Sequence, residues 1–397
     1  MTIRTTHVGS LPRTPELLKA NAAHREGSLS DADFTSVLQA EVDGVVKRQA
    51  EIGLDIVNDG EYGHAMLDTV DYGAWWTYSF SRFGGLSFEN SGGFELRPPA
   101  GRDGRLAFSS FAERRDWQRF ADAYGDPESG IQIVSDNKVV FPAIVDELTY
   151  IGAEAVERDI AGVKHALEAV GKPVSDGFVA AISPGSAARV GNAFYEDDEA
   201  VVWACADVLR EEYKRITDAG LTVQIDAPDI AEGWDQMNPE PSVEDYRAFS
   251  RVRIDALNHA LEGIDPSLVR FHVCWGSWHG PHTTDIAFKD IVDLALLVNA
   301  NGLTFEAANA RHAHEWTIWR DIELPDGKYL IPGVVSHSTN VVEHPELVAQ
   351  RIRQFADIVG DERVVASTDC GLGGRIYPSI AWAKLEALAE GARLASK

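Results

Sequence analysis

Short hydrophobic runs alternate with longer segments of helical periodicity along the chain. The runs are rich in Val, Ile, Phe and Ala and end in polar or glycine residues, a pattern typical of buried parallel strands. Eight of them stand out: TTHVGS (5–10), DIVNDGE (55–61), GFVAAISPG (177–185), TVQIDAP (222–228), VRFHVCWG (269–276), LTFEAA (303–308), LIPGVVSHS (330–338) and VVASTDCG (364–371). Strands that alternate with helices predict an α/β fold with a parallel sheet.

Residues 197–218 are a clear example of the helical segments. Asp197 stands where an N-cap residue belongs, and Gly220 follows the expected end. The apolar positions recur at helical spacing on one face: Val201, Cys205, Val208 and Ile216. We therefore expect Cys205 to be a core residue without chemistry.

Eight strand–helix repeats predict a closed (βα)8 TIM barrel, with an open doubly wound sheet as the alternative. A bare barrel needs about 250 residues, and this chain has 397. Most of the surplus lies in residues 62–176, after the second run. We expect one catalytic domain, residues 1–397, with 62–176 as an insertion. The insertion is either a lid over the barrel mouth or a packed structural element.

The charge balance excludes two classes of partner. The chain has 36 Lys and Arg against 62 Asp and Glu, a net charge of −26, whereas nucleic acids and anionic membranes need a basic face. No stretch approaches 18 consecutive apolar residues, and the N-terminal residues lack the apolar core of a signal peptide. Three cysteines make no disulfide framework. These features favour a cytoplasmic protein that binds neither nucleic acid nor membrane.

Polar side chains gather at the carboxyl ends of the predicted strands. In a barrel these ends meet on one face, where catalytic residues lie. The residues are Ser10, Glu61, Asp226, His272, Cys274, Glu306, His337 and Cys370.

The strongest single signal is His272-x-Cys274, because side chains at i and i+2 of a strand point to the same side. With Cys370 and Glu306 they offer one nitrogen, two sulfurs and one oxygen, a set that suits tetrahedral Zn²⁺. Two thiolates disfavour Mg²⁺ and Ca²⁺, while iron stays open by ligand type. The alternative is a buried His/Cys pair without a metal.

Several other residues keep more than one interpretation. His279 and His282 lie in the segment WGSWHGPH, and His312 and His314 follow Glu306. Each could be a surface residue, a substrate contact or another ligand. The GLGGR segment (371–375) is interpreted as a turn rather than a phosphate-binding loop.

The strand-end motifs also resemble a known family. TTHVGSLPRTPELL, NDGE, QIDAPD, HVC, FEAA and STDCGLGG resemble, in the same order, motifs of the catalytic barrel of cobalamin-independent methionine synthase. The resemblance runs from about residue 3 to residue 380 and is weakest in the insertion.

The resemblance implies a barrel of the uroporphyrinogen decarboxylase and methionine synthase type. It implies zinc held by His272, Cys274, Glu306 and Cys370. A small thiol such as homocysteine would bind the metal as a thiolate and attack a methyl donor. The amino-acid part of that thiol would contact Ser10, Glu61 and Asp226.

Two residues receive catalytic hypotheses. Glu306 is expected to leave the metal when the thiol binds, because its carboxylate is the hardest of the four donors. His337 is a candidate acid for the leaving group, since histidine moves protons near neutral pH; a supporting role beside the site is the alternative.

The chain departs from the synthase pattern after Cys274, at Trp275, Trp278 and the HGPH residues. Trp275, together with Trp278, Trp75 and Trp76, is expected to contact substrate or else to pack in the interior. Short relatives include enzymes that join coenzyme M to epoxides; there, Arg13 or Arg375 would hold the sulfonate. A zinc hydrolase and a purely structural zinc site are further alternatives. The sequence does not identify the methyl or alkyl donor, and it leaves a homo-oligomer open.

Overall fold

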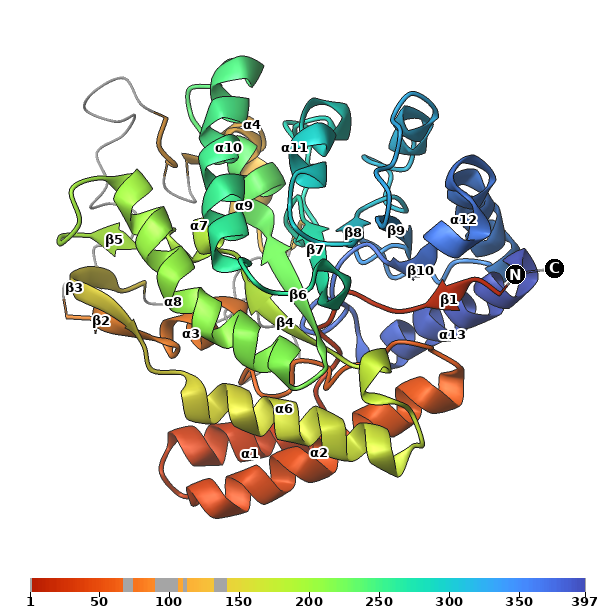
Figure 1. Cartoon of the computed structure of the whole chain (residues 1–397), viewed down its shortest axis with the longest axis horizontal. Coiled ribbons are helices and arrows are strands. Elements are labelled where there is room, and N and C mark those ends of the chain that lie inside the picture. Colours follow the sequence, from red (N-terminus) through yellow and green to blue (C-terminus); the bar gives the residue numbers. More distant parts are fainter. Residues whose placement is uncertain (1, 67–73, 90–105, 110–112, 132–140, 397) are drawn as a thin grey trace.

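The computed structural model describes residues 2–66, 74–89, 106–109, 113–131 and 141–396. Seven parallel strands form one curled sheet in the order β1-β10-β9-β8-β7-β6-β4 (Figure 1). They are β1 (Arg4–Thr5), β4 (Phe178–Ile182), β6 (Thr222–Ala227), β7 (Val269–Val273), β8 (Gly302–Phe305), β9 (Tyr329–Val335) and β10 (Val365–Thr368). Every residue of β4, β7, β8 and β10 is buried, as expected for strands covered on both sides.

The second hydrophobic run closes the sheet into a barrel. The amide of Ile56 donates to the carbonyl of Thr5 at 3.0 Å, and that of Phe178 donates to the carbonyl of Val57 at 3.1 Å. Val57 also forms a parallel bridge with Gly177. All eight predicted runs therefore contribute to the wall, and the (βα)8 barrel is confirmed over the open sheet.

Helices surround the strands (Figure 1). The long ones are α1 (Pro15–Arg25), α2 (Asp31–Ile52), α6 (Ala153–Ala169), α8 (Asp198–Asp218), α10 (Val243–Ala260), α12 (Pro345–Val359) and α13 (Pro378–Ala395). Helix α8 begins as predicted, with Asp197 as N-cap accepting from the Ala200 amide at 2.9 Å. None of the helices in the described ranges is long and apolar enough to cross a membrane.

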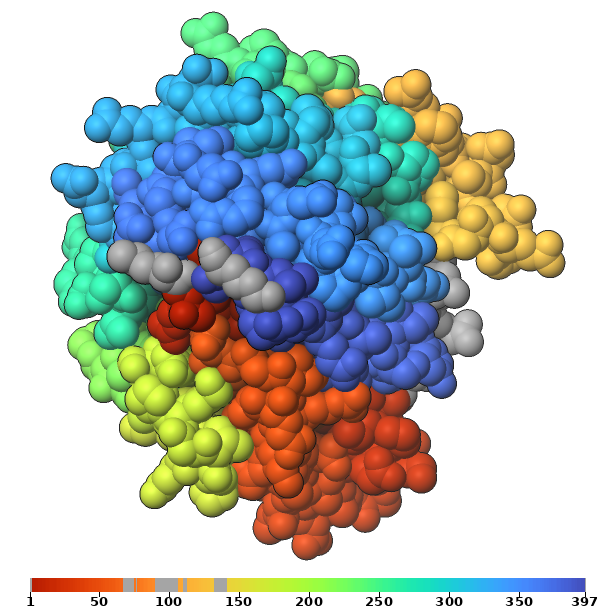
Figure 2. Space-filling view, turned by 90° about the vertical axis from the view of Figure 1, so that its right-hand side faces the viewer, coloured from red at the N-terminus to blue at the C-terminus, as the bar shows by residue number. Residues whose placement is uncertain are grey.

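The two ends of the chain meet on one side of the barrel. The Ile3 amide donates to Ser396 Oγ at 2.8 Å, and the Arg48 guanidinium of α2 lies 4.1 Å from the ring centroid of Trp382 in α13. Figure 2 shows these N-terminal and C-terminal segments, in red to orange and dark blue, lying side by side.

The expected insertion, 62–176, contains one helix of the barrel and several shorter elements outside it. Helix α6 at its end packs beside α2 as a helix of the barrel. Before it come α3 (Ala74–Phe80), β2 (Phe83–Ser87), α4 (Arg115–Arg119), α5 (Ala121–Gly125) and β3 (Ala143–Tyr150). Strand β3 pairs with β2 and with β5 (Gly191–Asn192) in a small second sheet. Parts of the proposed lid, and the side chain of Trp76, lie outside the described residues, so the lid stays a prediction.

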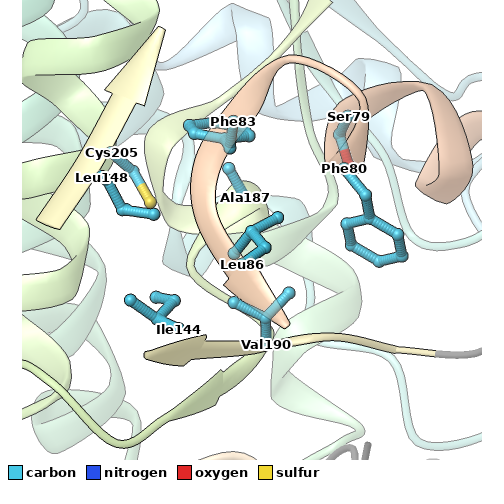
Figure 3. Close-up of a pocket in the computed structure, with 9 residues that line it drawn as sticks. All are labelled: Ser79, Phe80, Phe83, Leu86, Ile144, Leu148, Ala187, Val190 and Cys205. Atoms are coloured by element: carbon cyan, nitrogen blue, oxygen red, sulfur yellow. The ribbon is translucent and has the colours of Figure 1, made fainter. Parts of the chain in front are cut away.

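A small cavity lies under this second sheet (Figure 3). Its lining is almost wholly apolar and includes Phe83, Leu148 and Cys205. Its internal space of about 10 Å³ corresponds to about one water molecule. Cys205 is 1% exposed, which confirms its prediction as a core residue.

Candidate active site

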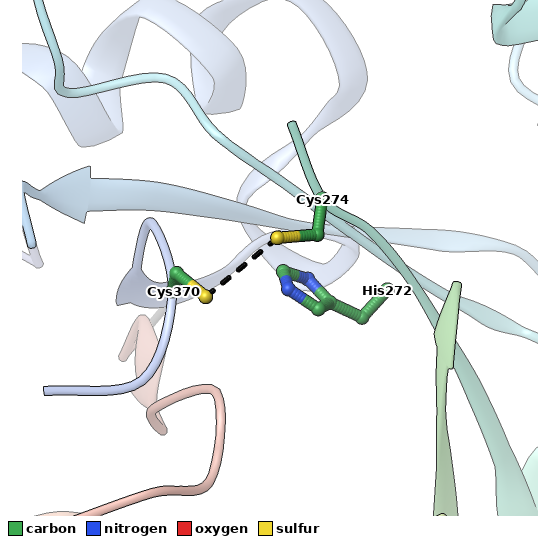
Figure 4. A group of neighbouring side chains, drawn as sticks. All are labelled: His272, Cys274 and Cys370. Carbon is green, nitrogen blue, oxygen red and sulfur yellow. Dashed lines mark hydrogen bonds between the residues drawn. The ribbon is translucent and has the colours of Figure 1, made fainter. Parts of the chain in front are cut away.

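Three of the predicted metal ligands come together at the carboxyl end of the barrel. His272 is in β7, Cys274 follows that strand, and Cys370 follows β10. One ligand atom from each lies within 4.8 Å of the other two, and all three residues are buried. Figure 4 shows the imidazole and the two thiol groups pointing toward one another, with 3.8 Å between the sulfurs.

The two sulfur atoms are joined by one hydrogen bond. The hydrogen bond to Cys370, together with burial, raises the pKa of the Cys274 thiol well above its usual range. The same hydrogen bond and the nearby His272 hold the pKa of Cys370 well below its usual range. The two pKa shifts run in opposite directions because the two thiol groups share one hydrogen bond, and the thiolate is the form that binds a metal.

His272 provides the clearest sign that this cluster takes a ligand. The residue is 2% exposed, and neither ring nitrogen has a hydrogen-bond partner among the described residues. Buried polar atoms without a partner are costly and need an explanation. A metal ion bound by one nitrogen and two sulfurs would provide it.

Glu306, the fourth predicted ligand, is turned to other partners. Its Oε1 accepts from the Trp275 amide at 3.0 Å and its Oε2 from Asn309 Nδ2 at 2.6 Å. Burial raises the pKa of Glu306 well above its usual range, and the Cys370 charge adds to this effect. Glu306 instead lies with His337 and Asp369, with one ligand atom of each within 4.8 Å of the others.

The three residues expected to hold an amino-acid substrate lie beside the cluster. Ser10, Glu61 and Asp226 are all buried. Burial, opposed by His272 and reinforced by Glu61 and Cys370, raises the pKa of Asp226 to about 7. Glu61 has a positive φ of 59° and lies 3.8 Å, through Oε2, from His64 Nδ1. Glu61, after the second hydrophobic run, and Asp226, in β6, therefore give this side of the cluster two carboxyl groups, which we name the acidic wall.

Arg13 is not available on this wall. Its guanidinium donates to Ser10 Oγ at 2.9 Å and to the carbonyls of Leu11, Gly60, Glu61 and His64. These contacts tie the loop after β1 to the loop after the second strand. Arg13 therefore supports the site and does not present its charge to a substrate.

His337 lies deep in the opposite side of the site. Burial lowers its pKa to about 3, opposed by Cys370 and reinforced by Arg375, His282 and His279. Its Nδ1 is buried and has no hydrogen-bond partner among the described residues. The ring is thus neutral at neutral pH, with one nitrogen open to a ligand.

The tryptophans are placed in packing positions. Trp275 is 1% exposed, its Nε1 donates to the Ile286 carbonyl at 2.8 Å, and its ring packs against Phe288 and His312. Trp278 stacks on His282 with 4.2 Å between ring centroids. These placements favour interior packing for both; substrate contact by Trp275 stays a prediction.

His312 belongs to a buried ion-pair network. Its ring nitrogens lie 2.8 Å from Glu315 Oε2 and 3.2 Å from Asp285 Oδ2. Asp285 also lies 3.2 Å from His282 Nδ1. His312 and His282 are therefore paired with carboxylates. The contact described for His279 is different, because its Nε2 donates to the His337 carbonyl at 3.2 Å.

Sequence analysis missed two residues that support the site. Asp369 accepts from the amides of Ala307, Ala308 and Asn309, and Asn309 links it to Glu306. Asp369 directly precedes Cys370, so its place in the strand-end motif DCG was a usable signal. Asn309 gave none beyond its position three residues after Glu306.

Known proteins resemble the chain over nearly its whole length. The sequence profile of the cobalamin-independent synthase catalytic domain matches residues 3–74 and 127–393. The 5-methyltetrahydropteroyltriglutamate–homocysteine methyltransferase of Pasteurella multocida is 24% identical over 97% of this chain and 42% of its own length. That of Chelativorans sp. is 25% identical over 98% of this chain and 42% of its own length. The chain thus spans about two fifths of these curated relatives.

A solved structure supports the fold. The B12-independent methionine synthase from Shewanella sp. W3-18-1, in complex with selenomethionine, superposes with a TM-score of 0.67 at 17% identity, covering 99% of this chain and 98% of that one. The profile match covers well over half of the sequence and includes the strand ends of the barrel that carry the site residues. The chain therefore belongs to the family of cobalamin-independent synthase catalytic domains.

Proposed function

We propose that this chain is a zinc-dependent S-methyltransferase that acts on a small, homocysteine-like thiol. The main support is the buried group of His272, Cys274 and Cys370, whose ligand atoms lie within 4.8 Å of one another. The activity in the names of the relatives, homocysteine methylation, supports the same reaction class.

The donor set fits zinc. Two sulfurs and one imidazole nitrogen match its preferred ligands, and the partnerless nitrogens of His272 leave one of them for the metal. Glu306 is the proposed fourth ligand, held nearby through Trp275 and Asn309. When bound, the zinc would supply the positive charge that keeps a substrate thiol deprotonated.

The protein's own groups would divide the remaining work. Glu61 and Asp226 form the acidic wall, which suits the ammonium group of an amino-acid thiol. His337 faces the leaving group in this proposal. Because burial lowers its pKa to about 3, the ring is neutral at neutral pH, and it could protonate the leaving group only after taking up a proton from solvent.

The hydrogen bonds of Arg13 to Ser10 Oγ and to backbone carbonyls disfavour it as the sulfonate-binding residue of the coenzyme M alternative. Arg375, the other candidate for that role, hydrogen-bonds the Gly373 carbonyl at 3.2 Å. Two thiolates in one ligand group also disfavour a zinc-bound water for hydrolysis, because they reduce the acidity of the metal.

X-ray absorption at the zinc edge tests the proposal, with the protein alone and with homocysteine, coenzyme M or cysteine added. We expect two sulfur ligands in the protein alone and three with homocysteine. A third sulfur with coenzyme M instead would assign the epoxide-opening reaction. An unchanged sulfur count with every thiol, or no bound zinc, would refute thiol activation.

Two substitutions test the assigned roles. Glu306→Gln should change thiol affinity or turnover, and full retention of both would remove its role as the exchanging ligand. His337→Asn should lower the rate and alter its pH profile if His337 acts on the leaving group. Wild-type values for both would remove that role.

A further inference from the structure

Two parts of this chain that lie outside the family motifs contact each other at the site. The first is residues 113–125, which we name the clamp segment; it contains α4 and α5 and lies within residues 75–126, which the family profile leaves unmatched. The second is residues 275–284, which follow the ligand Cys274 and which we name the histidine loop. Figure 2 shows the clamp segment, in amber, at the edge of the molecule beside the teal histidine loop.

Asp116 is the centre of the contact. It is 1% exposed, and both carboxylate oxygens bind the histidine loop. Oδ1 accepts from the amide and the hydroxyl of Thr283, each at 2.8 Å. Oδ2 accepts from the His282 amide at 3.1 Å and from the Tyr124 hydroxyl at 2.8 Å. These four donors satisfy both oxygens of the buried carboxylate.

The loop needs this support because its backbone is unusual. His282 has a positive φ of 51°, a conformation that costs free energy in a residue other than glycine. Such a conformation persists where its surroundings hold it, and the amides of this residue and the next both donate to Asp116.

The clamp segment also fixes the aromatic part of the loop. Trp278 Nε1 donates to the Tyr124 hydroxyl at 2.9 Å, and the Arg114 guanidinium lies 4.9 Å from the Trp278 ring centroid. A Cβ at Gly280 would overlap that same hydroxyl. The close approach of loop and segment therefore depends on a glycine at this position.

The histidine loop reaches the site at two points. Its Gly276 amide donates to Cys274 Sγ at 3.3 Å. His279 Nε2 lies 3.2 Å from the His337 carbonyl; since a carbonyl only accepts, Nε2 carries the hydrogen and Nδ1 of the neutral ring is an acceptor. The loop thus contacts the site beside Cys274, which follows β7, and beside His337, which follows β9.

We propose that Asp116 is a positioning residue that holds the histidine loop, and His279 with it, beside His337, the residue assigned above to the leaving group of the alkyl donor. In this proposal the acidic wall of Glu61 and Asp226 binds the thiol substrate, and the loop held by Asp116 determines how efficiently the alkyl donor reacts. This inference rests on the proposed function for the two substrates, but the attachment of the loop stands independently of it.

The experiment compares Asp116→Asn with Asp122→Asn in the full chain. Asparagine keeps one acceptor oxygen and turns the other into a donor, which faces the donors of Thr283, His282 or Tyr124. Asp122 is exposed in α5, so its variant removes the same charge from the same segment without touching the loop. Tyr124→Phe is a milder second variant, because it removes only the hydroxyl between Asp116 and Trp278.

Three readouts separate positioning from a general loss of structure. Hydrogen–deuterium exchange reports the loop, titration of cobalt-substituted protein with homocysteine reports thiol binding, and steady-state kinetics with 5-methyltetrahydropteroyltriglutamate or methylcobalamin reports donor use. For Asp116→Asn we expect faster exchange in 276–284, thiol affinity within about twofold of wild type, and kcat/KM for the donor lowered about tenfold to a hundredfold. Tyr124→Phe should give a smaller effect in the same direction, and Asp122→Asn none.

Equal exchange in Asp116→Asn and wild type would overturn the attachment of the loop. An equal loss of thiol affinity and donor kcat/KM, or unchanged donor kinetics, would overturn the selective role. If the wild-type protein binds no thiol at cobalt, the proposed function fails instead, and the exchange comparison still decides whether Asp116 holds the loop.

Discussion

Lys384→Met tests whether a buried ion pair holds the loop that carries His337. Lys384, in α13, is 0% exposed, and its Nζ donates to Glu343 Oε2 at 2.9 Å and to the Val341 carbonyl at 2.6 Å. Glu343 Oε1 accepts from the Ser336 amide, one residue before His337, at 2.8 Å. Methionine keeps most of the lysine volume and removes its charge, which leaves the Glu343 carboxylate buried without its cation.

The expected loss of folding stability follows from the unpaired Glu343 carboxylate. Breaking a buried pair by removing one partner costs about 3–5 kcal/mol of unfolding free energy. With an unfolding entropy of about 2.1 cal/mol/K per residue, 397 residues give about 0.8 kcal/mol/K. The melting temperature should therefore fall by about 4–6 °C.

Urea denaturation and thermal melting measure the change, with Lys289→Met, at an exposed lysine, as the matched control. The double variant Lys384→Met/Glu343→Gln should recover part of the loss, since glutamine carries no charge and still offers an oxygen to the Ser336 amide. A loss below about 1 kcal/mol, or a double variant no more stable than Lys384→Met alone, would refute the reasoning.

Three further predictions concern the site and its surroundings. Cys370→Ser should reduce bound zinc, whereas Cys205→Ala, at the small cavity, should keep the wild-type metal content; equal metal loss in both, by elemental analysis, would contradict the assigned ligands. Gly9→Ala should weaken homocysteine binding about tenfold, equivalent to about 1.4 kcal/mol, because Gly9 has a φ of +139° and its new Cβ would overlap Glu61 Oε1; wild-type affinity in a cobalt titration would count against it. Burial by itself would lower the pKa of His312, but hydrogen bonds to Asp285 and Glu315 raise it from 6.5 to about 10. The stabilisation that protonated His312 gives to the folded protein is therefore complete below about pH 6.5 and is lost as the pH rises toward 10. The difference in unfolding free energy between wild type and His312→Gln should shrink over this range, and a constant difference would exclude the ion pairs as its source.

The sequence by itself determined the barrel and the group of residues at its mouth. Hydrophobic runs mark strands buried on both sides, and their polar last residues must meet on one face once the strands are parallel. His272-x-Cys274 indicated a shared pocket because strand side chains alternate with a period of two. Helix α8 was equally predictable, since its N-cap, periodicity and terminal glycine are all local signals.

The tertiary structure alone decided which side chains face the site and which are engaged elsewhere. Arg13 and Trp275 follow strand ends, yet Arg13 donates to backbone carbonyls and Trp275 is buried against Phe288. Asp116 binds residues 282 and 283, more than 160 positions away. Local periodicity does not indicate contacts between distant segments. Such contacts depend on how loops pack against one another after the strands have closed into a barrel.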